Sequence, residues 1–335
     1  MHTTPTIIMA MAAFIALATW LGSILTRRLL VRCNILDKPN NRSSHSIPVP
    51  RGGGIPLIAI TLMGWLAMSK LGLEQLVEIN IVVSMAMFIA LVCWFDDVGE
   101  LSIVNRLGAQ VLVVTMSIIL IPINPSSLGL PGGLITYAAI GLLWLWFINI
   151  FNFMDGIDGI TGIETISICL GVSLTLGLLG PGAGFSQLAI ILASSTAGFL
   201  VWNWQPAKLF LGDVGSIPLG FLIGWLLIEV AAQGEWAAAI ILPGYYLTDA
   251  TLTLMYRAVK FEPIWKSHRQ HFYQRAVAGN LSHSQASTAI AITNMWLVSC
   301  ALLSTIFTLI ALINAVFGIV ILLCYFQLAS RKVRA

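Results

Sequence analysis

The stretch that decides the fold is "LITYAAIGLLWLWFI" at residues 134–148, followed directly by "NIFNFMDGIDGITG" at residues 149–162. The first part carries no charge and, with its neighbours, reaches the about 20 apolar residues that cross a bilayer as a helix. The second part holds two aspartates, two asparagines and three glycines. Asp155 and Asp158 either cap helices or face something charged, and the rest of the chain decides between these interpretations.

The composition indicates a membrane protein. The chain has 335 residues, of which 58% are hydrophobic and 9% charged, with a mean hydropathy of +0.91. Soluble domains carry roughly 25% charged residues. No long polar region separates the apolar runs, so residues 1–335 are predicted to form one integral membrane domain. No basic tract with interleaved aromatic residues appears, which argues against nucleic-acid binding. The five cysteines lack CxxC spacing, so neither a zinc site nor a disulfide framework is expected.

The fold predicted from the apolar runs is all-α and polytopic, with about eleven transmembrane helices. The first run lacks a basic n-region and a cleavage site, so it is expected to be a retained span. The expected spans are residues 6–26, 55–72, 79–95, 107–123, 132–151, 161–180, 186–204, 215–233, 236–257, 286–307 and 309–330.

The distribution of Lys and Arg predicts the orientation. With eleven spans, sixteen of the seventeen basic residues fall on one side of the membrane, and Lys70 alone falls on the other. Cytoplasmic loops carry the excess of Lys and Arg. The N-terminus is therefore expected outside and the C-terminus in the cytoplasm.

Aspartates from three separate segments reach the predicted cytoplasmic face. Asp96 and Asp97 end the third span, and acids at a helix C-terminus oppose the helix dipole, so capping does not explain them. Asp213, in "KLFLGDVGSIPLG", is equally well explained as a helix N-cap or as a functional acid. Carboxylate oxygens suit Mg²⁺, which also takes ligands from substrate phosphates.

The asparagines and aspartates after the fifth span form a possible polar stripe. If this segment is helical, Asp155 and Asp158 share a face, and Asn149, Asn152 and Asp155 repeat at three-residue spacing. Polar groups facing lipid are costly, so the stripe is expected to face protein, water or a ligand. The alternative is a glycine-terminated helix followed by a second, Asp-capped helix.

Two basic loops reach the same predicted face. In "HRQHFYQR", His271 is the strongest candidate for a site, although a basic loop that sets topology explains the arginines equally well. In "DKPNNRSSHSIPVPRGGG", His45 and Arg51 are candidates for phosphate contacts. The three glycines that follow are a candidate anion-binding nest. An equally good explanation of the whole loop is a basic segment that anchors this side of the protein in the cytoplasm. Asp249 lies inside the ninth expected span, below Pro243, and its role is open.

Taken together, "DKPNNRSSHSIPVPRGGG", "FDDVGELS", "NIFNFMDGIDG", "FLGDVGS" and the loop from Arg257 to Arg275 resemble the polyprenyl-phosphate N-acetylhexosamine-1-phosphate transferase family, or glycosyltransferase family 4, which includes the phospho-MurNAc-pentapeptide translocase. One motif departs. The family's loop usually carries Asp-Arg-x-His-x-His-His, and only Arg269 and His271 match. This form is similar to the branch that initiates O-antigen, whose sugars are often 6-deoxy N-acetylamino sugars.

The resemblance implies a reaction and its partners. A UDP-linked N-acetylamino sugar and undecaprenyl phosphate give undecaprenyl-diphospho-sugar and UMP, which initiates a lipid-linked glycan such as O-antigen lipopolysaccharide. It implies Mg²⁺ as cofactor, with Mn²⁺ as a substitute, a multi-pass protein of the bacterial inner membrane, and a homodimer as a possible assembly.

The resemblance also implies roles for the candidate residues. Asp97 and Asp213 are expected to bind the metal. Asp96, Asp97 and His271 are the expected catalytic residues, with one acid of the Asp96–Asp97 pair orienting or deprotonating the lipid phosphate. The residues expected to bind substrate are Asn149, Asn152, Asp155, Asp158, Arg51, His45, Arg106 and Arg269.

The rival function is a membrane transporter that uses intramembrane acidic residues. Most acids of this chain lie at one predicted edge of the membrane, whereas a transport path needs ionisable groups at the midplane. A CDP-alcohol phosphatidyltransferase would carry an Asp-Gly-x-x-Ala-Arg segment, which is absent.

Overall fold

Helices make up nearly all of the computed structural model, which describes residues 5–37, 39, 47–70, 78–99, 101–177, 182–263 and 268–331. In these residues the only sheet is a two-residue antiparallel pair, so the all-α prediction is confirmed. The elements in chain order are α1 (Pro5–Arg32), β1 (Leu36–Asp37), β2 (Val49–Pro50), α2 (Gly54–Lys70), α3 (Ile79–Gly99), α4 (Ile103–Leu120), the 3-10 helix η1 (Pro125–Leu128), α5 (Leu134–Phe153), α6 (Ile160–Leu176), α7 (Ala183–Asn203), α8 (Asp213–Ala232), α9 (Trp236–Ile241), α10 (Gly244–Val259), α11 (Phe272–Ala278), α12 (His283–Ser304) and α13 (Thr308–Arg331).

Most of the expected spans correspond to helices of the bundle. Ten of the eleven each coincide with one helix, with boundaries shifted by a few residues. Among the described residues, eight helices are long and apolar enough to cross a membrane, and α2 and α6 are apolar but only 17 residues long. The chain is a multi-pass membrane protein, while the number of crossings and their orientation stay predictions.

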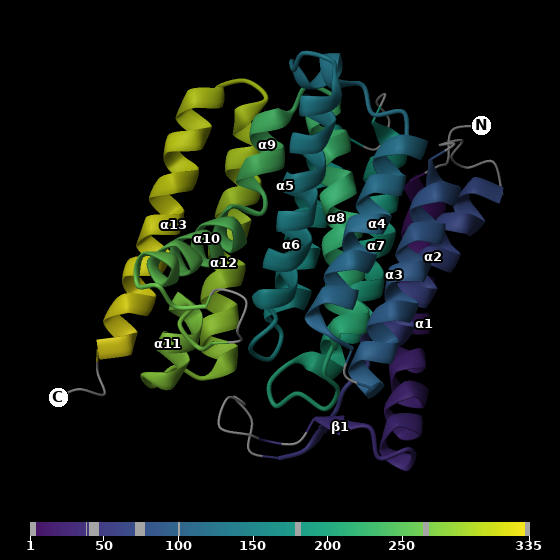
Figure 1. Cartoon of the computed structure of the whole chain (residues 1–335), viewed down its shortest axis with the longest axis vertical. Helices are drawn as coiled ribbons and strands as arrows, with labels where there is room; N and C mark the ends of the chain where they lie inside the picture. The colour runs from purple at the N-terminus through teal and green to yellow at the C-terminus, as the bar shows by residue number, and fades with distance from the viewer. Residues whose placement is uncertain are drawn as a thin grey trace.

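The ninth expected span, residues 236–257, is wrong as a single helix. The chain breaks between α9 and α10 at Pro243, which has no N–H to continue the helical hydrogen bonds. Figure 1 shows α10 lying across the long helices instead of along them. Asp249 therefore belongs to a crosswise helix and does not lie in the middle of a span.

α8 is the central helix of the bundle. Of its most apolar 18-residue window 83% is buried, compared with 22% for α1 and for α4. Aromatic side chains pack around it: Trp144 stacks on Phe221 with ring centroids 4.9 Å apart, and Trp65 lies 5.7 Å from Trp225. Because α8 is surrounded, Asp213 at its first residue is also held inside the molecule.

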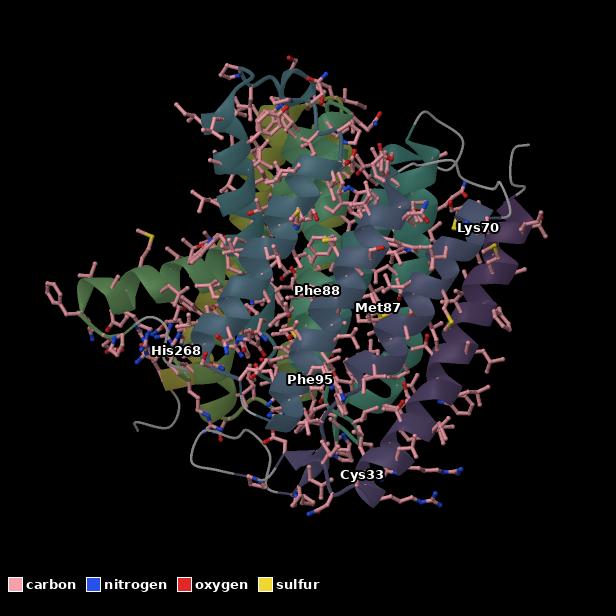
Figure 2. All side chains as sticks on the ribbon, turned by 45° about the vertical axis from the view of Figure 1, so that its right-hand side comes forward. Cys33, Lys70, Met87, Phe88, Phe95 and His268 are labelled. Carbon is pink, nitrogen blue, oxygen red and sulfur yellow. The ribbon has the colours of Figure 1, made fainter. Side chains whose placement is uncertain are left out.

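The outer surface of the bundle is apolar. Met87, Phe88 and Phe95 of α3 are 42%, 41% and 64% exposed, and Figure 2 shows them on the outside of the bundle. Figure 2 also shows Lys70 at the opposite end from Cys33, which follows α1. Exposed apolar side chains of this kind face lipid in a membrane protein.

The glycines at residues 52–54 serve packing. The backbone N–H groups of Gly52 and Gly53 donate to the carbonyl of Phe210 at 3.1 and 2.8 Å, and that of Gly54 donates to Leu211 at 2.8 Å. A Cβ on Gly54 would collide with the backbone of Gly215. These N–H groups are therefore not the anion nest that the sequence suggested, and their pairing places the neighbouring Arg51 beside the start of α8.

Candidate active site

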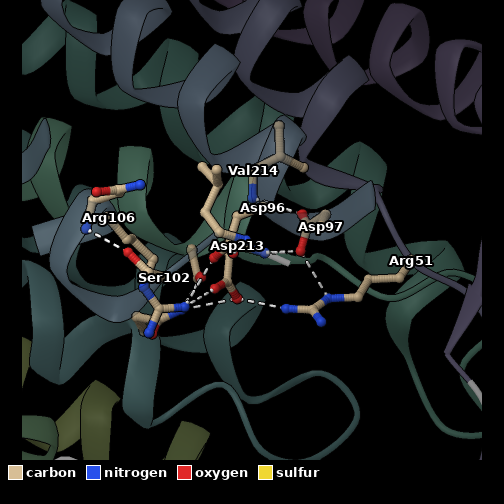
Figure 3. Close-up of polar contacts among 11 residues, drawn as sticks. Arg51, Asp96, Asp97, Ser102, Arg106, Asp213 and Val214 are labelled. Carbon is tan, nitrogen blue, oxygen red and sulfur yellow. Dashed lines mark hydrogen bonds and ion pairs between the residues drawn. The ribbon is translucent and has the colours of Figure 1, made fainter. Parts of the chain in front are cut away.

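Side chains from five segments meet where α8 begins. Figure 3 shows Arg51, Asp96, Asp97, Arg106 and Asp213 among them. α3 ends there with Asp96 and Asp97, α4 begins with Arg106 in its first turn, and α8 begins with Asp213. Arg51 comes from the segment between β2 and α2, and Asn152 comes from the last turn of α5. Residues more than 100 positions apart thus form one cluster, which we call the Asp213 cluster: Arg51, Asp96, Asp97, Arg106, Asn152 and Asp213.

Asp213 is the centre of this cluster. Its Oδ1 accepts from Nη2 of Arg51 at 2.6 Å and from Nδ2 of Asn152 at 3.2 Å. Its Oδ2 accepts from Nη1 of Arg106 at 2.6 Å. Both oxygens are thus occupied by side chains that carry positive charge or an amide. Asn152 also donates to Ser216 at 2.8 Å, which fixes the end of α5 against the first turn of α8.

Asp97 closes the N-terminus of α8 from a different helix. Its carboxylate accepts from the backbone N–H groups of Asp213 at 3.1 Å and Val214 at 2.9 Å, and from Nε of Arg51 at 3.0 Å. A negative charge is stabilised at this end of a helix, where N–H groups lack partners. Gly212 has φ +75°, and a Cβ there would lie 2.6 Å from an Asp97 oxygen, so the glycine makes this approach possible.

Asp96 points to the other side of the cluster. It accepts from the backbone N–H of Leu101 at 2.7 Å and from Nη1 of Arg106 at 3.1 Å. Arg106 therefore joins Asp96 to Asp213, as Arg51 joins Asp97 to Asp213. Burial acts to lower the pKa of Arg51, but the negative charges of Asp213 and Asp97 outweigh it, so the pKa of Arg51 lies above its usual value.

Asn149 lies one turn before Asn152 on α5, but it is outside the cluster. Its Nδ2 donates to Oε1 of Gln110 on α4 at 2.8 Å and to the carbonyl of Leu145 at 2.8 Å. The two asparagines do face protein, as the cost of exposing them to lipid predicts. Gln110 was not singled out from the sequence.

The turn between α5 and α6 separates the two aspartates of "MDGIDG". α5 ends at Phe153 and α6 begins at Ile160, so two helices separated by a turn are present, and Asp155 and Asp158 do not share a helical face. Asp155 accepts from the Thr161 hydroxyl at 2.7 Å. Burial raises the pKa of Asp155 to about 6, while that hydrogen bond acts to lower it, and the charges of Asp213 and Arg51 also reach it.

Asp158 turns toward a different set of partners. Its carboxylate lies 3.2 Å from Nδ1 of His283 and accepts from the backbone N–H of Ala207 at 3.0 Å. The Ser287 hydroxyl donates to the Asp158 carbonyl at 2.8 Å. These contacts tie the turn to the α7–α8 loop and to the start of α12, away from Asp213.

His271 lies in a second polar group, the Asp249 cluster, formed by Tyr245, Asp249, Thr253, His271 and Phe272. His271 is 1% exposed, and its Nδ1 is 3.2 Å from Oδ1 of Asp249. The Tyr273 hydroxyl donates to the carbonyl of Met154 at 3.1 Å, which binds this region to the turn that carries Asp155. Asp249, whose role the sequence left open, thus holds His271. In the sequence, Pro243 was the signal that the helix of Asp249, α10, is separate from α9.

The remaining candidates lie at or beyond the edge of the described residues. Arg269 is exposed, two residues before His271. His45 lies outside the described residues. Within the part of the chain that the structure describes, no group of three or more His, Cys, Asp or Glu side chains is arranged to hold a metal ion.

Comparison with known proteins finds a family that resembles the central part of the chain. The model of the family "Glycosyl transferase family 4" matches residues 79–231, which include Asp96, Asp97, Asn152, Asp155 and Asp213. This central part of the chain is similar to glycosyl transferase family 4. The family match thus contains all three acids of the Asp213 cluster, whereas Arg51 and the Asp249 cluster lie outside it.

The similarity to two curated relatives extends over most of the chain. It is 26% identical over 281 residues, 79% of this chain and 76% of the relative, to the probable undecaprenyl-phosphate N-acetylglucosaminyl 1-phosphate transferase of Bacillus subtilis. It is 25% identical over 299 residues, 83% of this chain and 78% of the relative, to the undecaprenyl-phosphate alpha-N-acetylglucosaminyl 1-phosphate transferase of Salmonella typhi. A phospho-N-acetylmuramoyl-pentapeptide-transferase of Moorella thermoacetica is 34% identical over 116 residues, 34% of each chain.

Proposed function

We propose that this protein transfers an N-acetylamino-sugar 1-phosphate from a UDP-sugar to undecaprenyl phosphate, releasing UMP. An oxygen of the lipid phosphate forms a new bond to the sugar-bearing phosphorus, and the bond from that phosphorus to UMP breaks, with UMP leaving as the anion. The match of residues 79–231 to the family model and the names of the relatives support a sugar-1-phosphate transferase. They favour it over the transporter that the intramembrane acids also suggested.

The observation that carries the proposal is the alternation of acids and arginines in the Asp213 cluster. Two anionic phosphates repel each other, so a site that joins them needs positive charge. Arg51 and Arg106 can contact phosphate oxygens, since guanidinium groups match their geometry. Phosphoryl transfer is catalysed mainly by positioning and charge stabilisation. The acids and arginines of the Asp213 cluster can provide both effects.

The donor set fits Mg²⁺ bound with substrate. Mg²⁺ usually takes one or two carboxylates, several waters and substrate phosphates, and a cage of three protein acids is not required. Asp97 and Asp213, which Arg51 joins, are the residues that would hold it, with Mn²⁺ as a substitute. When bound, the ion supplies positive charge between the two phosphate groups.

The other residues have supporting roles in this proposal. Lipid phosphate, with a second pKa near 6, is mostly dianionic at neutral pH, so Asp96 or Asp97 needs only to orient it. Asn152 and Asp155 bind the nucleotide-sugar, and Asn149, Asp158, His45 and Arg269 stay predictions for the same task. His271 is the remaining candidate for the diphosphate, placed by Asp249.

The sugar and the product are the finer part of the proposal. The motif "HRQHFYQR" supports initiation of O-antigen lipopolysaccharide with a 6-deoxy N-acetylamino sugar, in the bacterial inner membrane. The relatives are named for N-acetylglucosamine, which is the first donor to compare. A homodimer stays a prediction.

The test is transfer by the purified full-length protein in detergent. UDP-N-acetylglucosamine, UDP-N-acetylgalactosamine and a UDP-6-deoxy-N-acetylamino sugar are each incubated with undecaprenyl phosphate, with Mg²⁺, Mn²⁺ or a chelator. We expect UMP and a lipid-linked sugar phosphate in equal amounts from at least one donor with metal. Absence of both products from every donor, with protein that remains folded, would overturn the proposal.

A further inference from the structure

A buried carboxyl on α6 takes no part in the proposed mechanism. Glu164 is fully buried, and its Oε2 accepts from Nδ2 of Asn294 on α12 at 2.7 Å. Asn294 is 1% exposed. The backbone N–H of Tyr246, in the first turn of α10, also approaches this carboxyl. An ionisable group at such a place in a membrane protein is costly and needs a reason.

Two oxygen atoms of this pair have no hydrogen-bond partner among the described residues. They are Oε1 of Glu164 and Oδ1 of Asn294. Both are acceptors when the carboxyl is ionised, so neither can satisfy the other, and a buried charge would be left with an amide as its main partner. A proton on Oε1 changes this, because a protonated carboxyl is also a donor. If Oε1 donates to Oδ1 while Nδ2 donates to Oε2, both atoms are satisfied.

The pair lies next to the residues that hold Asp155. Thr161 is three residues before Glu164, on the same face of α6. Its hydroxyl donates to Asp155 at 2.7 Å, so in its 3.3 Å contact with the Tyr246 hydroxyl it must accept. Tyr246 is in turn three residues before Asp249, which holds His271. The N-terminal parts of α6 and α10 therefore connect the Glu164–Asn294 pair with Asp155 and with the Asp249 cluster.

We propose that Glu164 is protonated in the folded protein and forms a two-hydrogen-bond acid–amide pair with Asn294, and that this neutral pair is a positioning element for Thr161 and, through it, for Asp155. The positioning part rests on the proposed transfer reaction. The protonation part does not.

Infrared difference spectroscopy tests the protonation directly. Full-length wild-type protein and the Glu164→Gln variant are compared in detergent at neutral pH, in H₂O and in D₂O. We expect the carbonyl stretching band of a protonated carboxylic acid in the wild type and its loss in the variant. A difference spectrum that loses carboxylate bands instead would overturn the proposal, whatever the activity of the protein.

Kinetics test the positioning role. Glu164→Gln keeps a neutral pair and should keep kcat within about twofold, whereas Glu164→Leu leaves Asn294 unpaired and should lower kcat by roughly 10- to 100-fold. Thr161→Val should have a similar effect, and the double variant Thr161→Val/Glu164→Leu should be no worse than the poorer single variant. If the two losses multiply, Glu164 does not act through Thr161, and the positioning part is wrong.

Two controls separate positioning from stability. Ser173, also on α6, forms a 2.9 Å hydroxyl contact with Ser186 of α7, far from Thr161. Ser173→Ala should lower the melting temperature without lowering kcat. If Glu164→Leu does not fold, Asn294→Leu replaces it. If wild-type protein transfers no sugar phosphate, the proposed function and the positioning part both fail, and the infrared band still decides the protonation state.

Discussion

Asp213 and Asp249 are each the centre of a polar cluster, and the two clusters hold their aspartate differently. Asp213 accepts from Arg51, Arg106 and Asn152, all through side chains. The side chains of Arg51 and Arg106 are 38% and 25% exposed. Asp249 has a fully buried side chain, with the hydroxyls of Tyr245 and Thr253, the ring of His271 and the backbone N–H of Phe272 around it.

The Asp213 cluster can therefore exchange its partners for substrate, and we call it the exchangeable cluster. The Asp249 cluster holds one geometry, and we call it the fixed cluster. Arginine side chains at the rim of a cluster can leave Asp213 for phosphate oxygens without unfolding any element. The partners of Asp249 are fixed by the backbone and by packing, so the carboxylate fixes the orientation of His271. A charged substrate is then expected to rearrange the Asp213 cluster and to leave the Asp249 cluster unchanged.

The largest effect is expected from replacing Asp213, the centre of the exchangeable cluster. Asp213→Asn keeps the size of the side chain but leaves two arginines without their shared carboxylate, and a proposed metal ligand is lost. We expect kcat for UMP release to fall by about 100- to 1,000-fold. The matched control is Glu235→Gln, just beyond the opposite end of α8, which should retain wild-type activity. A folded Asp213→Asn protein with more than a tenth of wild-type activity would remove Asp213 from the mechanism.

Replacing Asp249, the centre of the fixed cluster, should lower kcat less than replacing Asp213, and its effect should not add to that of replacing His271. Asp249→Asn removes the acceptor that orients His271, and we expect kcat to fall by roughly 10- to 100-fold. His271→Gln should cost about the same, and the double variant no more, because the two residues act as a unit. Multiplicative losses would show that Asp249 and His271 act independently. Kinetic assays of the four proteins, with melting temperatures as a check of folding, decide this.

The sequence predicts the exchangeable cluster better than the fixed one. Asp96, Asp97 and Asp213 stand beside apolar runs, so their depth follows from the length of a membrane helix. Arg51 and Arg106 follow from the same map of spans. Contact between these residues does not follow from it, because the packing of α3, α5 and α8 is decided by their side chains over the whole length of the bundle.

Asp249 was misplaced because hydropathy treats residues 236–257 as one apolar run. The break at Pro243 depends on how α10 packs against α5 and α13, and a proline inside a span is often tolerated in membranes. Asp158 was grouped with Asp155 because both stand in one short motif. Only the turn that begins at Met154 shows that their side chains meet different partners.

Substitutions of Arg51 test whether its side chain moves from Asp213 to a substrate phosphate. Arg51→Ala removes a positive group that is proposed to pass from Asp213 to phosphate, so we expect the KM for the UDP-sugar to rise about tenfold while kcat changes less. Arg51→Lys keeps the charge but loses the fork that contacts Asp97 and Asp213 together, and should recover only part of the affinity. Full recovery by lysine would mean that charge alone is needed at this position.

A smaller effect is expected at Asp155, between the two clusters. Its pKa is about 6, and the Thr161 hydroxyl acts to lower it. If Asp155 acts as a carboxylate, kcat/KM falls about tenfold for each pH unit below that pKa. Besides lowering kcat, Thr161→Val removes the donor to the charged form of Asp155, so the acid limb of kcat/KM should also move to higher pH by about one unit. The matched control is Ser287→Ala, which loses a hydrogen bond to Asp158 in the same turn and should leave the limb in place.

The smallest effect is expected at His268, whose ring centroid lies 4.9 Å from that of His271. Burial, together with repulsion from the neighbouring His271 and Arg257, lowers the pKa of His268 to about 4. His268 is therefore neutral throughout the pH range in which the protein would work, and it carries no charge to a phosphate. His268→Asn should change kcat and KM by less than about twofold between pH 6 and pH 8. A large loss that varies with pH across this range would place His268 beside His271 in the reaction.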